Sequence, residues 1–363
     1  MQTVENPSEQ LTEEVEVANT EDDEFVPFKY SITSYGADYT VDGLVKRIEN
    51  GSIYVPNFQR AYVWTSKQAS RFIESLLLGL PVPGIILSKE QGASQKLLVI
   101  DGQQRLRTLQ YFYSGIFQPT KKEFALEQVQ YPFVGRTYDT LSEEDKRLLD
   151  DSILHATVVK QDQPTEDDSS IYHIFERLNT GGTLLKPQQI RASIYHGEFS
   201  DLLRDLNGNE SWRTMFGPIN KDMRDQELIL RFFALYFWSD KYSDPMKQFL
   251  NKFMSHNKNL NVYSDAELMQ LFVGTIETIE RCIGYKVFKP QKTLNAAVFD
   301  SIMVGIAKRL ETGQIINCSS LKDAYNTLLK NSDFATATER ATGNKERVAS
   351  RMKVAIAAFA EVL

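Results

Sequence analysis

The sequence predicts an α+β protein in which a small mixed sheet with helices is followed by an all-helical region. Short apolar runs of strand length alternate with helical spacing as far as residue 165, whereas helical spacing alone recurs beyond it. A polar, acidic stretch at 161–170 separates the two patterns. Because a chain of 363 residues usually divides its core, we expect a disordered acidic arm over 1–27, an α+β domain over 28–165 and a helical domain over 166–363.

The first 27 residues are rich in glutamate and poor in aromatic side chains, a composition typical of disorder. Residues 1–24 contain nine Asp and Glu and no Lys or Arg, so the remainder has 41 basic against 39 acidic residues although the whole chain carries a formal charge of -7. A nearly neutral body is compatible with an anionic partner such as a nucleotide or DNA. The arm itself would be a solubilising tail, a DNA mimic or a regulatory segment.

The α+β region begins with helical spacing over 41–49. Thr65 and Gln68 then form a capping-box pattern, which starts a helix that Gly79 and Pro81 end. Ser142 opens a further helix, after the one that follows Asp101–Arg105. The expected extended segments, which share strand length and apolar character, are residues 53–56, 84–89, 96–100, 124–129 and 153–160.

The second region shows helical spacing in one segment after another, and Pro187 stands at a favoured first helical position. The expected helices cover residues 171–178, 187 onward, 226–238, 245–254, 265–282, 294–310, 321–330 and 345–363.

Two cysteines, Cys282 and Cys318, form neither a disulfide framework nor a metal-ligand spacing, which favours a reducing compartment. The N-terminus lacks the basic and apolar regions of a signal peptide, and no apolar run reaches the roughly 20 residues needed to span a membrane. We therefore expect a cytoplasmic protein with no membrane partner.

The strongest candidate site is the turn from Asp101 to Arg105, which joins a predicted strand to a predicted helix. Gly102 would expose helix N-terminal amides, which bind phosphate well. Arg105 opposes the helix dipole unless an anion lies between them. Asp101 would hold a divalent cation or cap the helix, while Gln103 and Gln104 would position water or a nucleotide. The alternative is that Asp101 is a plain N-cap and Arg105 extends into solvent.

A second cluster, at residues 56–64, places aromatic side chains around an arginine. Phe58, Tyr62 and Trp64 would stack on a base or would anchor the following helix in the core. Arg60, beside Gln59, requires an anionic partner, either Asp101 or a ligand.

A third cluster surrounds the Asn-Thr-Gly-Gly turn at residues 179–182. The turn would be a simple helix C-cap, or Arg177, Asn179 and Arg191 would converge on the same pocket. Sequence spacing alone leaves both alternatives open.

Other catalytic templates are missing from the sequence. It has no Gly-Lys dipeptide, no Gly-x-Gly and no Gly-x-Ser-x-Gly, which excludes a Walker P-loop, a dinucleotide fingerprint and a hydrolase elbow. The four histidines have no zincin spacing.

Taken together, these motifs resemble the GmrSD-type family of restriction and anti-phage proteins. The matching segments follow the family's order and spacing over most of residues 40–240, and the segment 101–105, Asp-Gly-Gln-Gln-Arg, is the family's DGQQR hallmark. The other matching segments are residues 55–64, 80–83 and 175–182, with a further C-terminal likeness at 335–355.

The resemblance implies a ParB/sulfiredoxin-like fold whose DGQQR turn binds and hydrolyses a nucleoside triphosphate with Mg²⁺. It assigns catalysis to Asp101, Gln103, Gln104 and Arg105, with Asp101 as metal ligand. The residues that it assigns to nucleotide binding are Gln59, Arg60, Gly102, Thr108, Arg177, Asn179 and Arg191.

The function that the resemblance implies is that of an NTPase sensor or switch in prokaryotic antiviral defence. DNA, modified or from phage, and a separate nuclease subunit are the further partners it allows, because the chain shows no His-Asn-His nuclease motif of its own. The alternative is a non-catalytic DNA-binding module whose DGQQR turn contacts DNA phosphates, helped by Lys345, Arg347 and Arg351.

Overall fold

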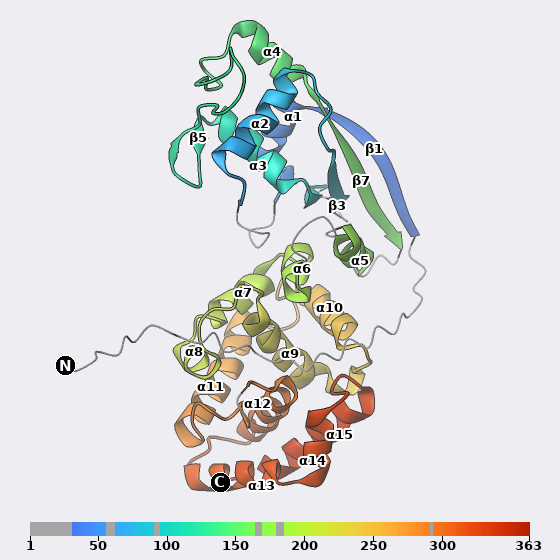
Figure 1. The fold of residues 1–363 in the computed structure, drawn as a ribbon. Coiled ribbons are helices and arrows are strands. Elements are labelled where there is room, and N and C mark those ends of the chain that lie inside the picture. The colour runs from blue at the N-terminus through green and yellow to red at the C-terminus, as the bar shows by residue number, and fades with distance from the viewer. Residues whose placement is uncertain (1–30, 56–61, 91–94, 164–168, 179–184, 291–292) are drawn as a thin grey trace, which may run out of the picture. The chain divides into compact units, whose positions relative to one another are not determined.

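The computed structural model describes residues 31–363, apart from 56–61, 91–94, 164–168, 179–184 and 291–292. The chain divides into an α+β unit that ends at His196 and a helical unit that begins at Gly197, so the predicted α+β class is confirmed (Figure 1). The division falls later than residue 165, because helices α5 (Ser169–Leu178) and α6 (Pro187–Ile194) belong to the first unit.

The sheet of the first unit is mixed. Its spatial order is β1 (Ser31–Thr40), β7 (Ile153–Gln163), β3 (Ile85–Lys89), β4 (Leu97–Asp101) and β2 (Ile53–Tyr54). The pairs β1–β7 and β3–β4 are antiparallel, and β7–β3 and β2–β4 are parallel. The register sets Ile86 opposite Asp101, so the last residue of β4 lies beside the beginning of β3.

One predicted strand is wrong. Residues 124–129 do not form a strand; the strand here is β6 (Lys122–Glu123), paired with β5 (Ile116–Phe117). Phe124 and Leu126 are nevertheless buried, and the Leu126 backbone bonds to loop residues. The apolar residues of this segment are therefore buried although the segment is irregular and belongs to no sheet.

Four helices accompany the sheet: α1 (Val41–Glu49), α2 (Ser66–Leu77), α3 (Gln103–Tyr113) and α4 (Glu143–Asp151). Thr65 and Gln68 form the expected capping box, and Ser142 caps α4. Helices α1 to α3 lie together on one face of the sheet (Figure 1), where Leu44 and Leu106 pack among inward-facing strand residues that include Ile85, Val99 and Leu154. This packing fixes the beginning of α3 at the end of β4.

All regular elements among the described residues of the second unit are helices. Its elements are α7 (Glu198–Leu206), α8 (Glu210–Phe216), α9 (Arg224–Trp238), η2 (Ser239–Lys241), α10 (Met246–His256), α11 (Asp265–Cys282), α12 (Ala296–Leu310), α13 (Cys318–Leu329), α14 (Ser332–Glu339) and α15 (Lys345–Phe359). Residues 296–307 of α12 are all buried, and α9 and α15 pack against this helix. Asp300 of α12 binds Arg231 of α9 and Arg351 of α15, at 2.5 and 3.1 Å.

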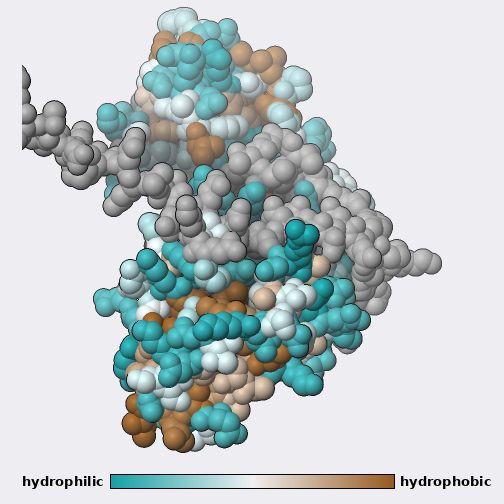
Figure 2. All heavy atoms as spheres, turned by 60° about the horizontal axis from the view of Figure 1, so that its bottom comes forward, coloured by the Kyte–Doolittle hydropathy of each residue, from teal (hydrophilic) through white to brown (hydrophobic). Residues whose placement is uncertain are grey.

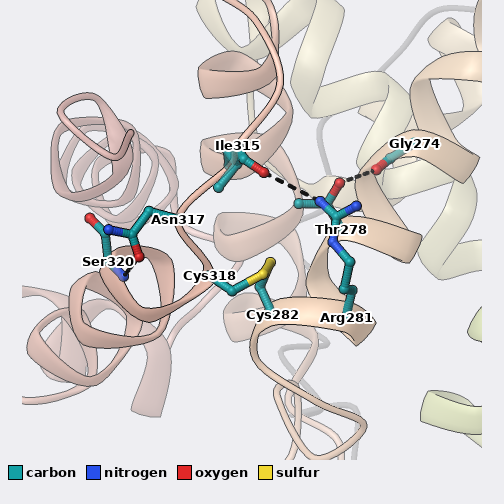
Figure 3. Close-up of a disulfide and its surroundings, with 8 residues drawn as sticks. All are labelled: Gly274, Thr278, Arg281, Cys282, Ile315, Asn317, Cys318 and Ser320. Atoms are coloured by element: carbon teal, nitrogen blue, oxygen red, sulfur yellow. Dashed lines mark hydrogen bonds between the residues drawn. A yellow bond between two sulfur atoms is a disulfide. The ribbon is translucent and has the colours of Figure 1, made fainter.

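The two cysteines correct the sequence analysis, because Cys282 and Cys318 form a disulfide (Figure 3). The bond joins the last residue of α11 to the first residue of α13, with Cα atoms 4.5 Å apart. Arg281 donates a hydrogen bond to the carbonyl of Ile315, so the same two segments are tied a second time. A separation of 36 residues gives no hint that two helix ends meet.

The described helices include none that is long and apolar enough to cross a membrane. On the face shown in Figure 2, hydrophilic side chains cover much of the surface and hydrophobic ones form separate patches. Single exposed apolar residues such as Ile316 are ordinary on protein surfaces.

Candidate functional site

The beginning of α3 is built on Gly102. This residue is the N-cap of the helix and has a left-handed backbone, with φ 97°. A Cβ atom here would lie 2.4 Å from Cγ2 of Ile85, so both conformation and space require glycine. Because glycine has no side chain, Gly102 itself cannot cap the first amides of α3 with a side-chain hydrogen bond. These amides, at the positive end of the helix dipole, can bind an anion.

Arg105 bends back toward the same turn. Its Nη2 atom lies 3.0 Å from Oδ2 of Asp101 and 3.3 Å from the position of a Cβ on Gly102. The Arg105 side chain is only 14% exposed, whereas that of Asp101 is 55% exposed. The alternative for this turn was that Asp101 is the N-cap of α3 and that Arg105 extends into solvent. Neither part fits this geometry, because Gly102 is the N-cap and Arg105 is largely buried.

Among the described residues, one nitrogen of this guanidinium has no hydrogen-bond partner. The Nε atom of Arg105 is buried and makes no hydrogen bond within the part of the chain that the structure describes. Nε of Arg107, two residues later on α3, is in the same situation. Buried guanidinium donors without acceptors are costly, so the start of α3 is positively charged and incompletely satisfied.

Gln104 makes contacts that the sequence did not reveal. Its Oε1 atom accepts hydrogen bonds from the backbone amides of Val63 and Trp64, at 3.0 and 3.3 Å. Gln103, by contrast, is half-buried at the first position of α3. The two glutamines of the motif therefore occupy different environments.

Thr108 was expected to bind nucleotide, but its position contradicts that role. The residue is fully buried, and its hydroxyl bonds both to the Gln104 carbonyl and to the Tyr62 hydroxyl, each at 2.7 Å. With these bonds and no exposed surface, Thr108 acts inside the unit. Only the three-dimensional contact with Tyr62 could have revealed this.

The structure describes only some of the remaining candidate residues of the first unit. Gln59, Arg60 and Asn179 lie outside the described residues. Arg177 belongs to α5, but its side chain is likewise outside the description. Arg191 of α6 is buried and donates a hydrogen bond to Gln188 at 3.0 Å. Convergence of these residues on the α3 turn stays a prediction.

The three basic residues expected to contact DNA also differ from one another. Lys345 is exposed and Arg347 half-buried, both in the first turn of α15. Arg351 is fully buried, bonds to Asp300 and donates to the Thr342 carbonyl. A side chain without exposed surface cannot reach a DNA phosphate, so the DNA-binding role of Arg351 is wrong.

At the α3 turn, Asp101 could hold a metal ion together with a ligand. Within the described ranges, no three His, Cys, Asp or Glu side chains come together as a metal site. Asp101 offers one exposed carboxylate, which fits Mg²⁺ because this ion is often bound by one or two carboxylates together with substrate phosphates.

Two comparisons with known proteins bear on this site. Residues 41–196 match the model of the GmrSD restriction endonuclease N-terminal domain, a range that begins with α1 and ends with the first unit. The chain is also 31% identical over 113 residues to an uncharacterized protein of Methanocaldococcus jannaschii, and the match covers 25% of this chain and 18% of that protein. The β4–α3 turn lies within the matched range, and residues 41–196 therefore form a domain of the GmrSD restriction endonuclease N-terminal family.

Proposed function

We propose that this chain binds and hydrolyses a nucleoside triphosphate at the beginning of α3, as the sensor or switch component of a restriction or anti-phage system. The family match supports a component of such a system. The nucleotide part depends chiefly on one observation, the start of α3 at a glycine N-cap with the largely buried Arg105 folded over it.

In this proposal, the amides that follow Gly102 bind phosphate oxygens. Arg105 neutralises negative charge there and in the transition state of phosphoryl transfer. Its buried Nε atom would gain an acceptor, which removes the cost of an unsatisfied donor. Gln103, at the first helical position, is the candidate for orienting water.

Asp101 would hold Mg²⁺ through its exposed carboxylate, with phosphate oxygens completing the coordination. When bound, the ion would supply positive charge between the phosphates and this carboxylate. Asp101 also holds Arg105 by their ion pair, so it has two tasks at the same turn.

DNA is the proposed macromolecular partner, because the family is one of restriction endonucleases. Lys345 remains a candidate phosphate contact, since it is exposed. We further propose that a separate nuclease subunit cuts the DNA. The chain would then report the nucleotide state to that partner.

Isothermal titration of ATP, GTP and CTP with Mg²⁺ tests the proposal. One of them should bind the wild type, and Arg105→Ala should weaken its affinity at least tenfold because one charge-assisted contact is worth about 1.5–3 kcal/mol. Arg71→Ala is the matched control, since Arg71 is an exposed arginine of α2 in the same unit. Its affinity should equal that of the wild type.

The opposite result has a clear meaning. If no nucleotide binds the folded wild type, the nucleotide proposal is rejected, and DNA binding becomes the function to measure. A steep decrease of DNA affinity with salt, unaffected by nucleotide, would identify the non-catalytic DNA-binding module.

A further inference from the structure

We infer that Gln104 and Thr108 are positioning residues: they fix the rotation of α3 and thereby aim its first turn and Arg105 at the nucleotide. The inference rests on the proposed function, because the aim of α3 matters only if its first turn binds the ligand. It replaces a catalytic role for Gln104 and a binding role for Thr108.

The side-chain amide of Gln104 has a fixed orientation. Two backbone N–H groups, from Val63 and Trp64, converge on it, and only its oxygen can accept from both. The second helical position of α3 is thus held by a segment that lies 40 residues or more away in sequence. An oxygen used in this way has little capacity left for a reacting water.

Thr108 provides the second tie, one turn further along α3. Its hydroxyl proton goes to the Gln104 carbonyl, which can only accept, so the Tyr62 hydroxyl is the donor to Thr108. Burial raises the pKa of Tyr62 to about 12, so the phenol keeps its donor proton at neutral pH. Gln104 and Thr108 are four residues apart and therefore lie on one face of the helix.

Aromatic contacts hold the segment 62–64, which supplies the hydrogen-bond partners of Gln104 and Thr108. Tyr62 packs edge-on against Tyr111 and Phe117, with ring centroids 5.0 and 5.7 Å apart. Trp64 packs against Phe72 of α2 at 5.7 Å, while Val63 between them is exposed. The segment 62–64 is therefore anchored in the core, and it is a firm support for α3.

The consequence for the site follows from helix geometry. Successive residues are about 100° apart around the axis, so fixing Gln104 and Thr108 also fixes the direction of Arg105. That direction brings the guanidinium to Asp101 and over Gly102. A small rotation of α3 would move the Arg105 guanidinium away from Gly102 and Asp101, where the proposed phosphate would bind.

The test uses Gln104→Ala, Thr108→Val and Thr108→Ser in the full chain, with Gln110→Ala as the control on the same helix. Hydrogen exchange of the Val63 and Trp64 amides reports the ties without any ligand, and titration with ATP, GTP and CTP plus Mg²⁺ reports the site. Gln104→Ala should speed exchange of both amides at least tenfold and weaken nucleotide binding at least tenfold. Thr108→Val should weaken binding in the same direction, and Thr108→Ser, which keeps the hydroxyl, should restore it.

Two results would overturn the inference. In one, exchange accelerates but nucleotide affinity stays at the wild-type value; in the other, Thr108→Val binds as tightly as Thr108→Ser. If Arg105→Ala loses binding while these variants keep it, only the positioning role is rejected. If the wild type binds none of the three nucleotides, the proposed function is rejected and the inference with it. Circular dichroism checks that each variant is folded. If Gln104→Ala does not fold, the comparison of Thr108→Val with Thr108→Ser tests the inference.

Discussion

Replacing Gly102 by alanine should destabilise the α+β unit by about 2–5 kcal/mol, and the structure separates two contributions to this cost. The left-handed backbone, with φ 97°, costs an L-residue roughly 1–2 kcal/mol. The new methyl group would also lie 2.4 Å from Ile85, and overpacking of this kind costs about 1–3 kcal/mol.

Gly79 supplies the matched control, because it too has a positive φ, +66°, but its surroundings are open. Apart from its chain neighbours, no atom of the described residues lies within 4 Å of the place that a Cβ would take. Gly79→Ala should therefore show the backbone cost alone, about 1–2 kcal/mol. Urea unfolding followed by pulsed hydrogen exchange of peptides from β4 and α3 measures both values within the α+β unit. Equal losses for the two variants would refute the argument that Ile85 closes the turn against any side chain.

Two further predictions concern other parts of the chain. Reducing the Cys282–Cys318 disulfide, or replacing Cys318 by serine, should destabilise the helical unit by about 4 kcal/mol, which is the chain-entropy value for a loop of this length. Urea unfolding with and without reductant measures this loss, and unchanged stability would contradict the prediction. Burial raises the pKa of Tyr62 from its ordinary value of 10 to about 12, so its contribution to stability is complete below pH 10 and is lost as the pH rises toward 12. Unfolding at pH 8 and 11 should show a smaller alkaline loss for Tyr62→Phe than for the wild type, and an equal loss would exclude this tyrosine.

Local sequence was sufficient for the strand, turn and helix that form the candidate site. An apolar run, a glycine and helical spacing follow one another within residues 96–115, and each is set by short-range preferences. Strand β1 was not predicted, because most of its side chains are exposed and it lacks the alternation of a half-buried strand. Pairing with β7, far along the chain, makes it a strand.

Side-chain roles were harder to predict than elements. The buried position of Arg351 had a signal in the sequence, since it lies between Val348 and Met352 on the apolar stripe of its helix. Its partner Asp300 is 51 residues away, and no pattern links the two. The acceptor role of Gln104 depends in the same way on a segment distant in sequence.

The charges at the α3 turn explain why such contacts matter for function. A helix N-terminus contributes about half a positive charge, and Arg105 adds a full one, while Asp101 removes only one. The turn is thus positive by about half a charge before any ligand binds, which favours a phosphate. In the proposed function, a triphosphate would bring several negative charges close to Asp101, so its tight binding would require a cation between the phosphates and that carboxylate. In the proposed function, Mg²⁺ dependence and the glycine N-cap would therefore be two consequences of one arrangement, in which Gly102 leaves room at the turn and Asp101 both holds Arg105 and calls for a metal ion.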